Sequence, residues 1–125
     1  MKPSNKTALF KLFFLLALTG SAVLAFIPDY SALPPLVSFS DLLNHISAFT
    51  VLFLLLKGAY PAFSVRNIVI LLFAYALWIE AIQYLLPTRH AAWSDIGADA
   101  AGLLTGYLIM ILLTKTSITK DIFTR

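Results

Sequence analysis

The sequence contains no cysteine, and this absence excludes disulfide bonds, thiolate chemistry and cysteine-ligated zinc sites. Charge is also scarce: Asp, Glu, Lys and Arg make up 12% of the 125 residues, whereas about 25% is usual in a soluble domain. Glycine-rich nucleotide loops, the H-E-x-x-H zinc motif and the G-x-S-x-G nucleophile motif are missing too. The commonest signatures of soluble enzymes are therefore absent.

Apolar residues are in excess, since they form 60% of the chain and give it a mean hydropathy of +0.88. Four apolar runs are long enough to cross about 30 Å of hydrocarbon as helices. The expected spans cover residues 9–27, 40–57, 67–86 and 95–113. A closed barrel is excluded because the chain is too short and too continuously apolar. We predict an all-α, integral membrane four-helix bundle that forms one domain over residues 1–125.

The first apolar run has a second interpretation as a cleaved signal peptide. Lys2 and Lys6 would form its basic region, and Val23-Leu24-Ala25 would form its cleavage site. We favour a retained span because the apolar run continues past this site to Ile27. At the other end of the chain, the short mixed tail after Lys115 is expected to fray.

The distribution of positive charge predicts the orientation. If the N-terminus is cytoplasmic, Arg89 alone among the nine Lys and Arg residues lies outside. The other eight, all on the cytoplasmic side, are Lys2, Lys6, Lys11, Lys57, Arg66, Lys115, Lys120 and Arg125. This excess follows the positive-inside rule, so we expect both termini in the cytoplasm. It also accounts for the net charge of +3 without a nucleic-acid partner.

Polar side chains recur on one face of each of the last three spans. They are Asp41 and His45, then Glu80 and Gln83, then Asp95 and Asp99. A charge at the bilayer centre costs at least about 2.5–3.5 kcal/mol, so the three polar faces are expected to meet one another rather than lipid. Because successive spans alternate in direction, all three lie near the exterior side. We predict an outward-facing polar pocket beneath the loop that carries Arg89 and His90.

Simpler roles are open for several of these residues. Asp41 and Asp95 are each good candidates for the N-cap of their span, and Gln83 for an interhelical hydrogen bond. The fourth span also carries a row of small residues, which favours close helix packing within the bundle over a dimer seam, although a homo-oligomer stays possible. The row consists of Ala98, Gly102 and Gly106.

By ligand type, the histidine and carboxylates of the polar set could hold a divalent metal ion, and they also suit acid–base chemistry. Only one histidine, His45, is well placed beside the carboxylates, so we assign no metal and no cofactor. A carboxylate beside a histidine suits proton transfer. His45 oriented by Asp41, with Glu80 as a second proton carrier, would be the catalytic candidates if the protein is an enzyme. A purely structural role for the cluster is the third reading.

The order of these motifs resembles that of the VanZ-like family. The matching elements are Asp41 with His45, Glu80 with Gln83, Pro87 with Arg89, and Asp95 with Asp99 and Gly102. Two positions depart from the family pattern: Leu42 stands where lysine is common, and Asp99 stands where asparagine is usual. Both changes make this set more acidic than in the family.

The resemblance implies a four-span protein of the bacterial inner membrane and cell envelope, in a family named for a protein associated with teicoplanin resistance. We therefore expect the site to bind a membrane lipid head group, a lipid-linked cell-wall precursor or a glycopeptide, with a membrane enzyme acting on such a lipid as the alternative. The expected ligand-binding residues are Asp41, His45, Glu80, Gln83, Arg89, Asp95 and Asp99.

Overall fold

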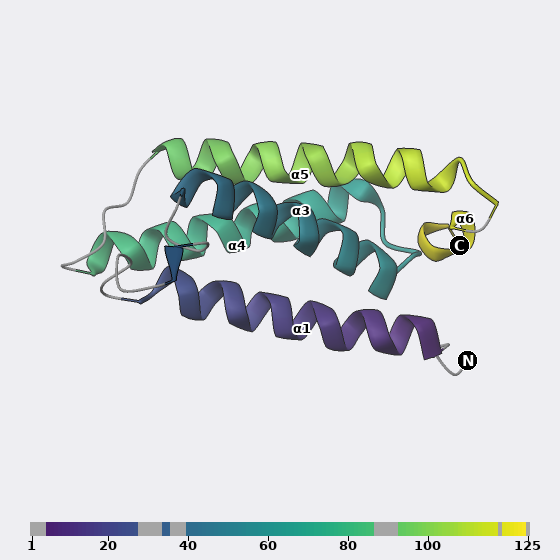
Figure 1. The fold of residues 1–125 in the computed structure, drawn as a ribbon, viewed down its shortest axis with the longest axis horizontal. Helices are drawn as coiled ribbons and strands as arrows, with labels where there is room; N and C mark the ends of the chain where they lie inside the picture. Colours follow the sequence, from purple (N-terminus) through teal and green to yellow (C-terminus); the bar gives the residue numbers. More distant parts are fainter. Residues whose placement is uncertain (1–4, 28–33, 36–39, 87–92, 118, 125) are drawn as a thin grey trace.

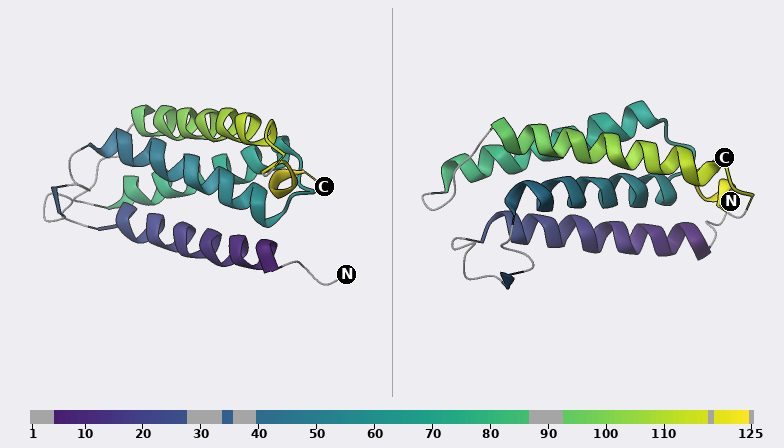
Figure 2. Two further views of the ribbon diagram at one scale, coloured as in Figure 1. Left: turned by 45° about the vertical axis from the view of Figure 1, so that its right-hand side comes forward. Right: turned by 45° about the horizontal axis from the view of Figure 1, so that its top comes forward.

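The structure, a computed structural model, describes residues 5–27, 34–35, 40–86, 93–117 and 119–124. Within these ranges all regular structure is helical. The helices are α1 (Asn5–Ala25), α3 (Asp41–Ala59), α4 (Val65–Leu85), α5 (Trp93–Thr114) and α6 (Lys120–Phe123). Helices α1, α3, α4 and α5 run side by side and are each long and apolar enough to cross a membrane (Figures 1 and 2). The predicted all-helical, four-span architecture is thus confirmed.

The helix starts differ from the sequence-based prediction in an informative way. Ser40 is the N-cap of α3, and its side chain accepts a hydrogen bond from the Leu43 amide. Helix α5 begins at Trp93, which places Asp95 inside its first turn. The interpretation of Asp41 and Asp95 as N-caps is therefore wrong. Both carboxylates still lie in a first helical turn, where the helix dipole favours negative charge.

Helix α3 lies at the centre of the bundle and packs against α1, α4 and α5. The core is built mainly from one face of α3 and the facing sides of α4 and α5. Its most buried apolar members are Phe49, Leu52, Phe53, Leu56, Ile68, Leu72, Ala76 and Leu103. Helix α1 is peripheral, and large side chains such as Leu15 and Leu16 are more than half exposed, as suits contact with lipid.

The C-terminal segment corrects a further prediction. Instead of fraying after Lys115, the chain turns and forms α6, which packs against α5 and α3. The reason is Phe123, whose side chain is 5% exposed and joins the apolar core at this end of the bundle. Helix α6 and the start of α1 lie at the same end (Figure 1).

Charge divides between the two ends of the bundle. Every Lys and Arg in the described part of the chain lies in the half that carries α6: Lys6, Lys11, Lys57, Arg66, Lys115 and Lys120. The acidic side chains of α3, α4 and α5 all lie toward the opposite end, near the start of α3 and α5 and the last turns of α4. This acidic end holds the candidate site.

Candidate functional site

The close approach of α3 and α5 shapes the site. A Cβ atom added at Gly102 would lie 2.5 Å from the Ile46 carbonyl oxygen and 2.8 Å from the Phe49 Cβ. The Thr50 hydroxyl lies 3.1 Å from the Gly102 carbonyl and donates a hydrogen bond across the same contact. Gly102 is therefore a position where the absence of a side chain lets two helix backbones touch. The contact lies one turn along α5 from Asp99.

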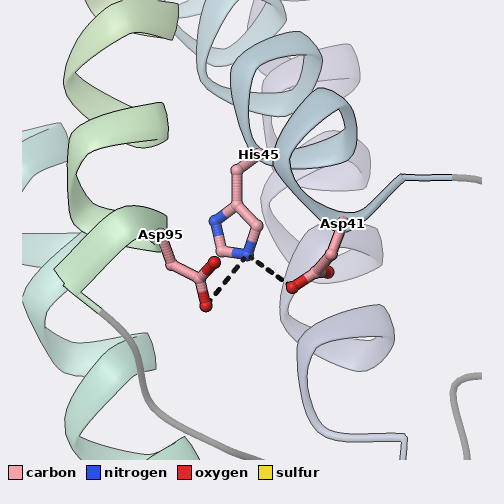
Figure 3. Close-up of side chains that lie close together, drawn as sticks. All are labelled: Asp41, His45 and Asp95. Atoms are coloured by element: carbon pink, nitrogen blue, oxygen red, sulfur yellow. Dashed lines mark ion pairs between the residues drawn. The ribbon is translucent and has the colours of Figure 1, made fainter.

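His45 lies among three carboxylates that come from two helices. Its Nδ1 atom is 2.6 Å from Asp99 Oδ1, while its Nε2 atom is 3.8 Å from Asp41 Oδ2 and 3.9 Å from Asp95 Oδ2. Figure 3 shows the imidazole pointing between Asp41 of its own helix and Asp95 of α5. The side chains of His45, Asp95 and Asp99 are 10%, 8% and 2% exposed, whereas that of Asp41 is 43% exposed.

The carboxylate that orients His45 is not the one expected. The sequence assigned this role to Asp41 because it precedes His45 by four residues on one helix face. In the structure Asp99 is the hydrogen-bond partner, and Asp41 is too distant from Nε2 for a hydrogen bond. The tight contact at Gly102 brings the first turns of α5 against α3, so Asp99 reaches His45 from the side. With Nδ1–H donating to Asp99, the Nε2 atom faces Asp41 and Asp95.

A cavity of about 80 Å³ adjoins the histidine between α1, α3 and α4. Its lining combines polar groups from α3 with mostly apolar groups from the other helices: Ser21, Leu24, Ala25, Asp41, Asn44, His45, Ala48, Phe49 and Ile79. Two of these lining residues, Asp41 and His45, were predicted from the sequence as site residues. The cavity is thus less polar than the pocket expected from the sequence, and it uses α1 as a wall.

Glu80 and Gln83, the predicted site residues of α4, lie on the buried face of that helix. Gln83 is 1% exposed, and its Nε2 atom donates a 2.8 Å hydrogen bond to the Ala25 carbonyl in the last turn of α1. That carbonyl has no partner within its own helix, as is usual for the end of a helix. Glu80, one turn earlier, is 8% exposed. The hydrogen bond of Gln83 is the interhelical role that the sequence left open for it.

Helix α1 contributes polar contacts that the sequence-based reading overlooked. The Tyr75 hydroxyl lies 2.9 Å from the Leu18 carbonyl and 2.8 Å from the Ser21 Oγ, so it ties α4 to α1 beside the cavity. Leu24 and Ala25 follow Ser21 by three and four residues, which places all three on one side of α1. This spacing was the feature of the sequence that could have indicated that α1 forms a wall of the cavity. Arg89 and His90, the predicted loop members, lie outside the described residues.

Comparison with known proteins gives one family. A family model described as VanZ/LLP1 matches residues 5–114, which include all four long helices. No curated protein and no solved structure matches the chain. The match spans nearly the whole sequence, and the four helices have the length and apolar composition of membrane spans. The chain therefore belongs to the VanZ/LLP1 family and is a multi-pass membrane protein of the cell envelope.

Proposed function

We propose that the protein binds the polar head group of a membrane lipid or of a lipid-linked cell-wall precursor at the His45 site. The observation that carries the proposal is the cavity beside His45. One part of its lining is ionic or hydrogen-bonding, through Asp41, Asn44 and His45, and another is apolar, through Leu24 and Ile79. A lipid has the same division, because its polar head group joins directly to apolar chains.

The size of the cavity narrows the ligand class. One water molecule needs about 10–15 Å³ of such space, so a cavity of about 80 Å³ accommodates a group the size of several water molecules. An amino, hydroxyl or phosphate group at the end of a head group fits this space. A whole glycopeptide does not, and it would contact only the surface above the site. Head-group binding is therefore favoured over glycopeptide binding.

Lipid addition to the purified protein in detergent tests the proposal. Phosphatidylethanolamine, phosphatidylglycerol and an undecaprenyl-pyrophosphate-linked precursor are compared with diacylglycerol, which lacks the head group. We expect at least one of the three to raise the thermal unfolding midpoint above the diacylglycerol value. Asp41→Asn should weaken binding of that lipid about 10- to 100-fold, because a hydrogen bond to a charged group contributes about 1.5–3 kcal/mol.

The matched control is Asp121→Asn, which removes the same charge from α6 at the opposite end of the bundle. It should retain full lipid protection. Equal protection by diacylglycerol, or unchanged protection in Asp41→Asn, would contradict head-group binding and leave the cluster with a structural role. Mass spectrometry of the added lipid extends the experiment to the enzyme alternative, which the short His45–Asp99 hydrogen bond favours. If the protein converts a lipid to a product and His45→Ala abolishes that conversion, the protein is an enzyme that requires His45.

The orientation of the chain completes the proposal. The cation-rich end of the bundle should face the cytoplasm of a bacterial inner membrane and the acidic end should face outward. The chain has no cysteine, so single cysteines report position without background. We expect Trp93→Cys, at a residue 88% exposed at the acidic end, to react with a membrane-impermeant maleimide in intact spheroplasts. Lys115→Cys should react only after lysis, and the reverse pattern would place the site in the cytoplasm.

A further inference from the structure

The Nε2 atom of His45 belongs to a group of possible metal ligands. One carboxylate oxygen each from Asp41 and Asp95 and one nitrogen of His45 lie within 4.8 Å of one another. Zinc bonds to nitrogen and oxygen measure about 2.0–2.2 Å, so two ligands of one ion lie up to about 4.2 Å apart. The Nε2 distances of 3.8 and 3.9 Å fall within this limit. Asp41, which is nearly half exposed, has room to close the remaining gap.

The orientation of His45 is an independent sign of a ligand. The imidazole is nine-tenths buried, and its Nε2 atom is too far from either Asp41 or Asp95 for a hydrogen bond. A neutral imidazole that donates from Nδ1 to Asp99 presents the Nε2 lone pair to these two carboxylates (Figure 3). Negative charge facing a lone pair is unfavourable unless a proton or a cation lies between them.

The hydrogen bond from Nδ1 to Asp99 is the arrangement that supports metal-bound histidines. Such histidines usually donate their second ring N–H to a carboxylate, which fixes the tautomer and makes the ligating nitrogen more basic. Asp99 is 2% exposed and comes from the neighbouring helix, so it holds the ring from outside the ligand group. Asp99 would therefore be a positioning residue and not a ligand.

We infer that Asp41, His45 and Asp95 bind a divalent transition-metal ion, with Asp99 positioning the imidazole. Two carboxylates and one imidazole are a mixed oxygen and nitrogen set, which suits Mn²⁺ or Zn²⁺ better than Ca²⁺ or Cu⁺. The inference rests on the proposed function because the metal ion and the head group would share one site. It adds to that function the ion that would hold the head group. Three protein ligands leave coordination positions for phosphate oxygens of a head group, as at sites where protein carboxylates share a metal with a substrate phosphate.

Metal titration of the detergent-solubilised, lipid-free protein tests the inference. After chelator treatment, the full-length chain is titrated with Mn²⁺ or Zn²⁺ alone by calorimetry, and bound metal is counted by mass spectrometry. We expect one ion per chain, with a nitrogen coupling from the His45 imidazole in the pulsed electron paramagnetic resonance spectrum of bound Mn²⁺. Asp41→Asn and Asp95→Asn should each weaken binding at least tenfold, and Asp99→Asn about 10- to 100-fold.

Asp121→Asn is again the control and should bind as the unchanged chain does. A loss of metal binding in Asp41→Asn is not expected to reflect misfolding. Asp41 is the most exposed of the residues around His45, and asparagine has the same shape as aspartate. The unfolding midpoint of this variant without metal should match that of the unchanged protein. Absence of stoichiometric metal, or metal retained by both Asp41→Asn and Asp95→Asn, would overturn the inference. Because no lipid is present in this titration, such a result would not contradict head-group binding, which the lipid-addition experiment tests separately.

Discussion

Replacing Gly102 with alanine is expected to destabilise the bundle and loosen the site together. The added methyl group would lie 2.5 Å from the Ile46 carbonyl oxygen. A backbone oxygen cannot rotate away as a side chain can, so α3 and α5 must separate. Overpacking of this kind costs about 1–3 kcal/mol. The unfolding midpoint should fall, and the His45–Asp99 contact should lengthen, because Asp99 lies one turn from Gly102 on α5.

Gly97→Ala on the same helix is the matched control. A Cβ atom at Gly97 would meet nothing within 4 Å, so the same chemical change should leave the site unaffected. It should not lower the midpoint, because alanine favours a helix over glycine by up to about 1 kcal/mol. Metal or lipid affinity measured on both variants separates a packing defect from a site defect. If Gly102→Ala has the midpoint and ligand affinity of Gly97→Ala, the helices are not as close as the structure places them.

Lys57→Met is expected to have the second large effect. Lys57 is 8% exposed, and its ammonium group donates to the Pro61 carbonyl at 2.8 Å and the Phe63 carbonyl at 2.6 Å. The side chain thus ties the end of α3 to the short connection that leads into α4. Methionine has a similar length but no donor. We expect a loss of about 1.5–3 kcal/mol, the contribution of a hydrogen bond from a charged group.

Thermal unfolding in detergent measures this loss, with Lys115→Met as the control. Lys115 is an exposed lysine at the same end of the bundle, so its replacement removes equal charge but no such clamp. An equal drop in both variants would mean that charge alone matters, and no drop in Lys57→Met would mean that the clamp contributes little. The sequence suggested a role for Lys57 in orientation only, because its burial depends on how the connection folds back.

The four spans could be predicted because apolar length is a local property of the sequence. The helix starts were harder to place, because Ser40 and Asp41 are adjacent and both residue types are good N-caps. The course of the C-terminal tail depended on whether Phe123 found an apolar surface. That surface is formed by α3 and α5, which are distant from it in the sequence.

The sequence predicted which helix faces carry the site residues, but it did not predict which side chains contact one another. Spacing placed Asp41 with His45, and Asp95 with Asp99, on their helix faces. It could not show which carboxylate meets which ring nitrogen, because that depends on the interhelical distance set at Gly102. The expectation of no metal rested on counting histidines. A metal site instead depends on where the carboxylates of a second helix lie relative to His45, and the sequence does not show this.

The hydrogen bond between His45 and Asp99 joins residues 54 positions apart in the chain. During biosynthesis, therefore, α3 enters the bilayer well before α5 leaves the ribosome. Until then the imidazole lies in the insertion machinery or in lipid without its later hydrogen-bond partner, and a buried polar group that lacks its partner costs about 1–3 kcal/mol. Translation arrest between α4 and α5 should thus yield a nascent chain that remains associated with the translocon and is degraded once released.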